Sequence, residues 1–158
     1  DENSMTSFED RYEMCRLALE EYNYLEVSDF ENTFSERSYT YRTLTKYKEL
    51  HPKDDLYFIM GGDSLDYFDK WCHPEIIASK CTILVVVREA FEKKQMEEKI
   101  KSIGRLFPCD IRLCGCPKYD AASSEIRSII KKQNLDSSEL DALLNANVRK
   151  YISDKNLY

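Results

Sequence analysis

Glycine and proline are scarce in this sequence, net positive charge is absent, and no long hydrophobic run occurs. Only 4 Gly and 4 Pro are found among 158 residues, of which 42% are hydrophobic, so the composition is not that of a disordered chain. We expect residues 1–158 to form one globular domain with a substantial core.

The charge and hydropathy patterns exclude two classes of partner. The formal net charge of −6 gives no long-range attraction to a polyanion, and no stretch interleaves basic with aromatic residues, so nucleic acid is not expected. The longest apolar run, Thr82 to Val87, is far shorter than the roughly 20 residues of a membrane helix, and the acidic N-terminus is unlike a signal peptide. The sequence therefore predicts a soluble, cytoplasmic protein without a membrane segment.

Several catalytic and metal-binding signatures are missing as well. The sequence has no Ser-His-Asp arrangement, Cys-His pair or Walker-type lysine loop, and we interpret His51 and His73 as structural. The six cysteines lie mostly in expected helices and strands, which favours reduced thiols. The cluster of Cys109, Cys114 and Cys116 lacks the paired Cys-x-x-Cys spacing of structural zinc sites, so no metal site is predicted there.

The N-terminal part is expected to begin with a helix. Thr6 and Glu9 have the spacing of a capping box. A strand is predicted from Leu25 to Glu31, and a second helix follows Ser38-Tyr39-Thr40 and ends before Pro52. In the first helix, apolar residues at helical spacing are expected to face a core: Phe8, Tyr12, Cys15, Leu19 and Tyr22.

Short apolar runs in the middle of the chain predict strands. Asp55 to Met60 is nearly all apolar, which is typical of a strand covered on both faces, Thr82 to Val87 is the strongest strand pattern, and Asp110 to Cys114 is a shorter one. Helical stretches alternate with these strands: Leu65 to Trp71, a short piece after Pro74, Phe91 to Leu106, Ser123 to Lys132, a piece around Leu140, and Val148 to Lys155. This alternation predicts an α/β fold with a doubly wound parallel sheet.

Sheets of this kind bind ligands beyond the carboxyl ends of their strands. At Gly61 and Asp63 the chain leaves a strand and enters a helix, so the backbone can approach a ligand and a carboxylate can accept hydrogen bonds from ribose hydroxyls. An ordinary tight turn with Asp63 as the helix N-cap would have the same sequence, and both interpretations stay open. The same rule directs attention to two further places: the pair Arg88-Glu89 and the loop 115–124.

Two other positions have both a binding and a structural interpretation. Ser123 and Ser124 place hydroxyls at a helix N-terminus with Arg127 one turn further on, which suits an anion, but a serine-capped helix with a solvated Arg127 would look the same. Trp71, the single tryptophan, could be a platform for a flat heteroaromatic ring or an ordinary core residue.

Six short motifs occur in order along the chain. They are Arg11-x-x-Met14-x-x-Leu17-Ala18, Ser38-Tyr39-Thr40-x-x-Thr43-Leu44, the run Phe58 to Leu65, Trp71, Ser123-Ser124-x-Ile126-Arg127 and Val148-x-x-Tyr151-Ile152. Over nearly the whole chain this series resembles the bacterial nicotinate mononucleotide adenylyltransferases. The order of Ser-Tyr-Thr-x-x-Thr-Leu, Gly-x-Asp and Trp is more specific than any single motif.

This resemblance implies a Rossmann-like nucleotidyltransferase fold and an enzyme of NAD biosynthesis. The enzyme would transfer AMP from ATP, accompanied by Mg²⁺, to nicotinate mononucleotide, giving deamido-NAD and pyrophosphate. The implied nicotinate mononucleotide-binding residues are Tyr39, Thr40 and Trp71; the implied ATP-binding residues are Gly61, Asp63, Ser123, Ser124 and Arg127, of which Arg127 is also the implied catalytic residue.

The sequence departs from the family at one important place. The family's glycine-rich His-x-Gly-His loop, which follows its first strand, is not found, so we expect that the fold lacks its first β-α-β unit through truncation and that the fragment is inactive. Two alternatives remain: another adenylyltransferase of the same fold, such as a pantetheine-phosphate enzyme, or a non-catalytic nucleotide-binding module. The preference for nicotinate over nicotinamide mononucleotide and the formation of a homo-oligomer are left open.

Overall fold

The computed structural model describes residues 6–34, 38–87, 90–117, 123–132 and 138–158, with the side chains of residues 90–92 and 138 excepted. The chain divides into two compact units. Unit 1 consists of residues 1–30 and 119–158, and unit 2 consists of residues 31–118. Among the described residues, no helix is long and apolar enough to cross a membrane.

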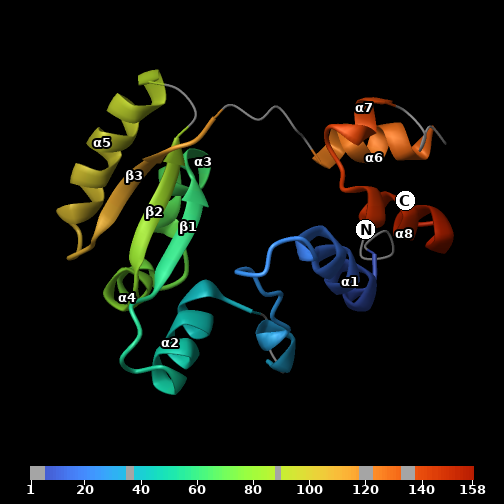
Figure 1. The fold of residues 1–158 in the computed structure, drawn as a ribbon. Coiled ribbons are helices and arrows are strands. Elements are labelled where there is room, and N and C mark those ends of the chain that lie inside the picture. The colour runs from blue at the N-terminus through green and yellow to red at the C-terminus, as the bar shows by residue number, and fades with distance from the viewer. Residues whose placement is uncertain (1–5, 35–37, 88–89, 118–122, 133–137) are drawn as a thin grey trace. The chain divides into compact units, whose positions relative to one another are not determined.

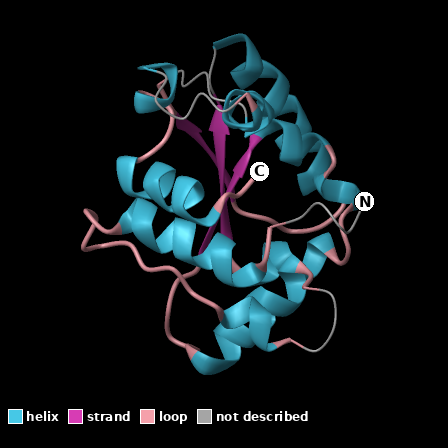
Figure 2. Cartoon of the chain, turned by 90° about the vertical axis from the view of Figure 1, so that its right-hand side faces the viewer, coloured by secondary structure: helices cyan, strands magenta, loops and turns pink. Residues whose placement is uncertain are grey.

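Unit 2 is built on a parallel sheet of three strands in the order β1-β2-β3 (Figure 1). The strands are β1, Tyr57–Gly61; β2, Thr82–Val87; and β3, Ile111–Gly115. Ile59 lies opposite Leu84, which in turn lies opposite Arg112, and all three strands run in the same direction (Figure 2). The predicted α/β fold with a parallel sheet is confirmed.

The helices of unit 2 follow the predicted order, with bounds shifted by a few residues. They are α2, Thr40–Leu50; α3, Gly62–Asp66; the 3-10 helix η3, Phe68–Lys70; α4, Pro74–Lys80; and α5, Ala90–Gly104. The stretch predicted as one helix from Leu65 to Trp71 is divided into α3 and η3, because the chain leaves the α-helical conformation at Tyr67.

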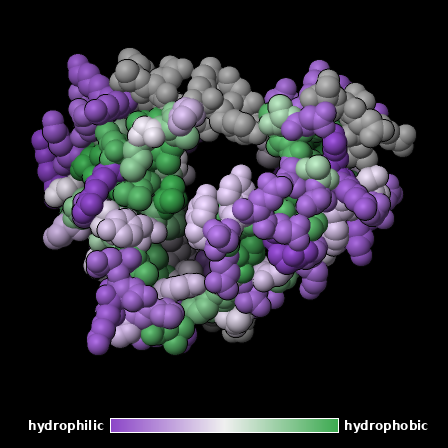
Figure 3. All heavy atoms as spheres, in the orientation of Figure 1, coloured by the Kyte–Doolittle hydropathy of each residue, from purple (hydrophilic) through white to green (hydrophobic). Residues whose placement is uncertain are grey.

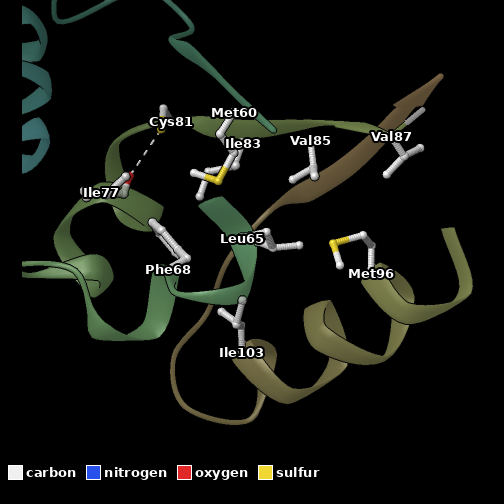
Figure 4. Packing of buried hydrophobic residues seen from close by; sticks show 10 residues of the cluster. All are labelled: Met60, Leu65, Phe68, Ile77, Cys81, Ile83, Val85, Val87, Met96 and Ile103. Carbon is white, nitrogen blue, oxygen red and sulfur yellow. Dashed lines mark hydrogen bonds between the residues drawn. The ribbon is translucent and has the colours of Figure 1, made fainter. Parts of the chain in front are cut away.

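The core of unit 2 lies on one face of the sheet (Figure 4). Alternate residues of β2 point into this core, as the two-residue period of a strand requires. The helices α3 and α5 supply the opposing side chains, and Leu65 and Ile103 are fully buried. The buried cluster consists of Met60, Leu65, Phe68, Ile77, Cys81, Ile83, Val85, Val87, Met96 and Ile103.

The opposite face of the sheet is exposed at β1. Tyr57 is 55% exposed and Ile59 is 66% exposed, and hydrophobic residues gather over β1 and β2 in Figure 3. The prediction that this strand is covered on both faces is therefore wrong for the described residues. The apolar run was a correct sign of a strand, but no described helix of unit 2 covers this second face.

Unit 1 is helical in its described residues. Its helices are α1, Phe8–Leu19; α6, Ser123–Lys131; α7, Ser138–Asp141; and α8, Ala146–Lys155. Its buried residues are Ile130, Leu140, Val148 and Ile152. The hydroxyl of Tyr151 on α8 donates a 2.9 Å hydrogen bond to Asp10 on α1, so these two helices are joined by a polar contact as well as by packing.

Two predictions for α1 are wrong. The N-cap of α1 is Ser7, whose hydroxyl accepts the N–H of Asp10 at 3.0 Å. The cap therefore lies one residue later than Thr6, where the capping box predicted it. The side of α1 that packs on the core carries Met14, Leu17 and Ala18, whereas Cys15 is exposed. The period of 3.6 residues allowed either set of positions, and only the packing partners decide between them.

The predicted strand from Leu25 to Glu31 is not formed. This segment is irregular and then enters a 3-10 helix, Phe30–Thr33. The hydroxyl of Ser28 accepts the N–H of Phe30 at 3.2 Å, and such local bonds compete with strand pairing. Leu25 is exposed, so burial does not favour a strand there either.

Candidate functional site

A pocket of about 270 Å³ brings together the three residues predicted to bind the mononucleotide. Tyr39 and Thr40 come from the start of α2, and Trp71 directly follows η3. We call this cavity the Trp71 pocket; it is lined by Ser38, Tyr39, Thr40, Trp71, Cys72 and Ile77. The sequence analysis did not predict Cys72 or Ile77 as pocket residues. Cys72 could have been inferred because it directly follows Trp71, whereas nothing in the sequence pointed to Ile77.

The start of α2 gives one wall of this pocket its polar character. Tyr39 occupies the N-cap in an extended conformation, and its carbonyl accepts the N–H groups of Arg42 and Thr43 at 2.9 and 3.2 Å. The first N–H groups of a helix have no carbonyl partner within that helix, and the helix dipole makes this end positive. Thr40 is the first residue of α2, so its hydroxyl lies at this positive end.

Trp71 is both a pocket residue and a core residue. Its ring packs at steep angles against Phe68, with ring centroids 5.7 Å apart, and against Phe58, with centroids 6.1 Å apart. It is partly buried against the core of unit 2 and also lines the Trp71 pocket. The two interpretations of this residue are therefore not exclusive.

A second pocket, of about 320 Å³, lies at the carboxyl ends of β1 and β2. We call it the Asp63 pocket; it is lined by Gly61, Gly62, Asp63, Asp66, Val86, Gln95 and Met96. Its position agrees with the rule for ligand sites of parallel sheets. Asp66 could have been found from the sequence, because it lies three residues after Asp63 and so on the same side of a helix. Gln95 had no such signal, since only the packing of α5 brings it here.

The structure separates the two interpretations of Asp63. The N-cap of α3 is Gly61, and Asp63 is the second residue of the helix, so it is not the ordinary capping residue. Its side chain is exposed and makes no ion pair or hydrogen bond within the part of the chain that the structure describes. A Cβ added to Gly62 would lie 3.4 Å from the sulfur of Met96, whereas one added to Gly61 would meet open space. Gly61 therefore leaves its surroundings accessible to a ligand.

The predicted phosphate-binding residues lie on α6 in unit 1. Ser123 and Ser124 are the first two residues of the helix, and the guanidinium of Arg127 donates a 3.4 Å hydrogen bond to the Ser123 hydroxyl. The same guanidinium lies 5.8 Å from the ring centre of Tyr158. All three predicted residues are exposed. The residues that precede Ser123 lie outside the described part of the chain, so the serine-cap interpretation stays open.

Some predicted places lie outside the described residues: Arg88, Glu89 and residues 118–122 of the loop 115–124. The remaining predicted residues are described in two separate units, Gly61 and Asp63 in unit 2 and the α6 residues in unit 1. Their convergence on one ATP molecule stays a prediction. No group of three or more His, Cys, Asp or Glu side chains in the described ranges is arranged to hold a metal ion.

A larger cavity, of about 550 Å³, lies beside α2 and contains none of the predicted site residues. Phe34, Tyr41 and Ile76 provide its apolar surface, and Arg42 and Lys46 lie at its wall. Its size alone does not favour it over the two pockets above, because the residues predicted from sequence are gathered elsewhere.

Comparison with known proteins gives consistent results. The sequence model of the family described as cytidylyltransferase-like matches residues 1–129. A protein of Clostridium botulinum (strain Okra / Type B1) named probable nicotinate-nucleotide adenylyltransferase is 36% identical over 149 residues, which cover 94% of this chain and 72% of that protein. A protein of Clostridium tetani with the same name is 37% identical over 129 residues, covering 77% of this chain and 61% of that protein.

Solved structures show the same similarity. The nicotinic acid mononucleotide adenylyltransferase of Plasmodium falciparum, complexed with APC, matches with a TM-score of 0.76 and 26% identity, over 98% of this chain and 77% of that one. A second structure of that enzyme, complexed with NaAD, also matches with a TM-score of 0.76 and covers 100% of this chain.

Proposed function

The chain belongs to the cytidylyltransferase-like family, and we propose from this premise that it is a nicotinate-nucleotide adenylyltransferase of NAD biosynthesis. The reaction transfers AMP from ATP to nicotinate mononucleotide, giving deamido-NAD and pyrophosphate. The names of the relatives and the NaAD complex of the similar structure support this activity.

The Trp71 pocket is the observation that carries the proposal beyond family membership. A pyridine mononucleotide needs a flat apolar surface for its ring and polar donors for the group on that ring. Trp71 supplies the first, and Thr40 with the start of α2 supplies the second. These residues are far apart in the sequence, and they line one cavity because α2 packs against α4, the helix that follows Trp71.

The charge at the start of α2 favours nicotinate over nicotinamide. A carboxylate carries a full negative charge, and the positive end of a helix dipole stabilises an anion by about 0.3–1 kcal/mol at exposed sites. A carboxamide gains much less from the same field. α2 has 11 residues, which is long enough for its dipole to act at Thr40. We therefore propose that the carboxylate of the nicotinate ring lies toward Thr40.

The Asp63 pocket suits the ribose of a nucleotide. The exposed carboxylate of Asp63 can accept hydrogen bonds from two neighbouring hydroxyls, and Gly61 and Gly62 let the sugar approach the backbone. Asp66 adds a second carboxylate at the same wall. Two carboxylates do not suit phosphate, so we assign this pocket to sugar hydroxyls and not to the triphosphate.

Ser123, Ser124 and Arg127 are assigned to the ATP phosphates. The exposed start of α6 and the planar guanidinium are donors of the kind that phosphate oxygens accept. ATP arrives as its Mg²⁺ complex, so Mg²⁺ is part of the substrate and needs no cluster of protein ligands of its own. An oxygen of the mononucleotide phosphate attacks the α-phosphorus in line, the bond to the bridging oxygen breaks, and pyrophosphate leaves with that oxygen.

The chemical step needs no covalent intermediate on the protein. Charge spreads over the reacting phosphates in the transition state, and Arg127 with the helix N–H groups would neutralise part of it.

We also propose that the enzyme acts in the cytoplasm, since all six cysteines are free thiols.

The test is an assay of pyrophosphate release and dinucleotide formation by the full-length gene product. We expect ATP with nicotinate mononucleotide to be the best substrate pair, with nicotinamide mononucleotide and pantetheine phosphate used much less well. Thr40→Val should raise the KM for nicotinate mononucleotide. It should also lower the ratio of kcat/KM for nicotinate mononucleotide to kcat/KM for nicotinamide mononucleotide. Binding of nucleotides without turnover would favour the non-catalytic module, and a preference for pantetheine phosphate would favour the other adenylyltransferase.

A further inference from the structure

His73 has an unusual backbone conformation. Its φ of 53° and ψ of 56° lie in the left-handed region, and the next residue is Pro74, which begins α4. A residue before proline normally has an extended backbone, and a non-glycine residue in the left-handed region is uncommon. Strained residues of this kind persist only where the surrounding structure holds them, and they gather at ligand sites.

Several contacts hold His73 in place. The edge of its ring packs against the ring of Tyr41, with centroids 4.7 Å apart and an interplanar angle of 67°. Its Nδ1 lies 3.2 Å from a carboxylate oxygen of Glu75. Its carbonyl accepts the N–H groups of Ile76 and Ile77 at 3.1 and 3.3 Å, which fixes the start of α4. The ring itself is half exposed, so burial alone does not explain its position.

The contact between His73 and Tyr41 joins the two walls of the Trp71 pocket. Tyr41 directly follows Thr40, which lines one wall, and His73 directly follows Cys72, which lines the other. The two rings therefore lie against each other one residue beyond the pocket on both sides. Trp71 and Cys72 directly precede His73. The left-handed turn at His73 therefore also sets the direction of this segment relative to α4.

We propose that His73 is a positioning residue for the mononucleotide substrate. Its left-handed backbone and its contact with Tyr41 set the separation of Trp71 and Thr40, and thus the fit of the pyridine ring. This inference rests on the proposed function of the Trp71 pocket. It differs from the structural interpretation of His73 drawn from sequence, because a structural residue would affect stability without changing substrate preference.

Variants at His73 separate the backbone conformation from the side chain. His73→Val places a β-branched residue where the left-handed conformation is strongly disfavoured, whereas His73→Gly and His73→Asn tolerate it. We expect His73→Val to raise the KM for nicotinate mononucleotide about tenfold in the full-length gene product, with the KM for ATP unchanged within twofold. His73→Gly and His73→Asn keep the backbone conformation but lose the ring contact with Tyr41, so the KM should rise only severalfold, as in a loss of that contact alone.

A second pair of variants tests the ring contact without changing the backbone at His73. Tyr41→Leu removes the ring and should raise the same KM severalfold, whereas Tyr41→Phe keeps the ring and should not. Asn156→Val is a matched control, because Asn156 is also left-handed, with a φ of 51°, but ends α8 in unit 1. It should lower stability and leave the KM for the mononucleotide unchanged.

A measurement on the free protein keeps this inference separate from the proposed function. Trp71 is the only tryptophan, so its emission and its quenching by acrylamide report on the pocket without any substrate. His73→Val and Tyr41→Leu should both shift this signal, and Tyr41→Phe, which keeps the ring, should not. An unchanged signal in the first two variants would overturn the positioning role whatever the activity shows. A shifted signal in an enzyme that does not use the mononucleotide would overturn the proposed substrate alone.

Discussion

The ammonium group of Lys99 on α5 lies 2.7 Å from the carboxylate of Asp69, in the 3-10 helix that leads directly to Trp71. Both side chains are largely covered, with 22% and 27% of their surface exposed. The hydrogen bond from Lys99 lowers the pKa of the Asp69 carboxyl group below its usual value. This pair ties the segment before Trp71 to the helix on the core face of the sheet.

Lys99→Met should lower the free energy of unfolding by about 1 kcal/mol at pH 7, as is usual for such a pair. Because the pKa of Asp69 is lower in the folded than in the unfolded protein, its contribution is present above the unfolded value of about 4 and is lost as the pH falls through the folded value. Urea unfolding at pH 7, 5 and 3 should show the full difference at the first two and a smaller one at pH 3. Lys101→Met, an exposed residue of the same helix, is the control. An equal loss at pH 3 would show that packing of the lysine stem, and not charge, is responsible.

Trp71→Ala should affect both stability and substrate affinity. Loss of ring contacts with Phe58 and Phe68 destabilises the core by up to about 3–5 kcal/mol, and loss of stacking raises the KM for nicotinate mononucleotide about tenfold. Phe107→Ala is the matched control, because the Phe107 ring also packs against Phe68, with ring centroids 6.3 Å apart, and does not line the pocket. It should lower the melting temperature without changing the KM. The same KM change in both variants would assign Trp71 to the core alone.

Nicotinate mononucleotide should protect Cys72 from alkylation. This thiol is exposed and lines the Trp71 pocket, so a bound ring would cover it. Peptide mass spectrometry after iodoacetamide treatment should show slower labelling of Cys72 at saturating ligand, with Cys15 on α1 labelled at an unchanged rate. Cys81 should stay unlabelled throughout, because burial raises the pKa of its thiol to about 11. Equal labelling of Cys72 with and without ligand would place the substrate elsewhere.

Arg127→Lys should weaken ATP use more than mononucleotide use. A planar fork with several donors is replaced by a point charge, and loss of one charge-assisted contact costs about 1.5–3 kcal/mol. Steady-state kinetics with each substrate varied in turn would measure the effect on the KM for ATP and on kcat. Arg16→Lys is a suitable control, since Arg16 is also in unit 1 and is held by Glu13 at 2.8 Å. An unchanged KM and kcat for ATP in Arg127→Lys would remove Arg127 from the site.

The elements that the sequence predicted well are those in which local pattern and tertiary packing agree. Thr82 to Val87 is a strand with the predicted bounds, because a run of apolar and mostly β-branched residues is favoured locally and also fills the middle of the sheet. α2 begins at Thr40 and ends before Pro52, where proline opposes a longer helix. Gly61 and Asp63 were predicted where a strand ends and a helix begins. In the structure Gly61 is the last residue of β1 and Asp63 is the second residue of α3.

The predictions that were wrong share a different property: they depended on a partner elsewhere in the chain. Leu25 to Glu31 has enough apolar residues for a strand, but a strand also needs a neighbouring strand, and local hydrogen bonds take its place. The face of α1 could not be chosen from its period alone, because apolar and aromatic residues occur on more than one side.

By itself, the sequence determined that this chain is an α/β protein, because strand and helix periods are local properties, and the order of its short motifs carried the resemblance to the nucleotidyltransferases. Only the tertiary structure decided that Tyr39, Thr40 and Trp71 line one pocket, since α2 and η3 must first pack on the same core. The left-handed backbone of His73 was likewise decided by tertiary contacts, because a histidine before proline is intrinsically extended and only Tyr41, Glu75 and the start of α4 hold it otherwise.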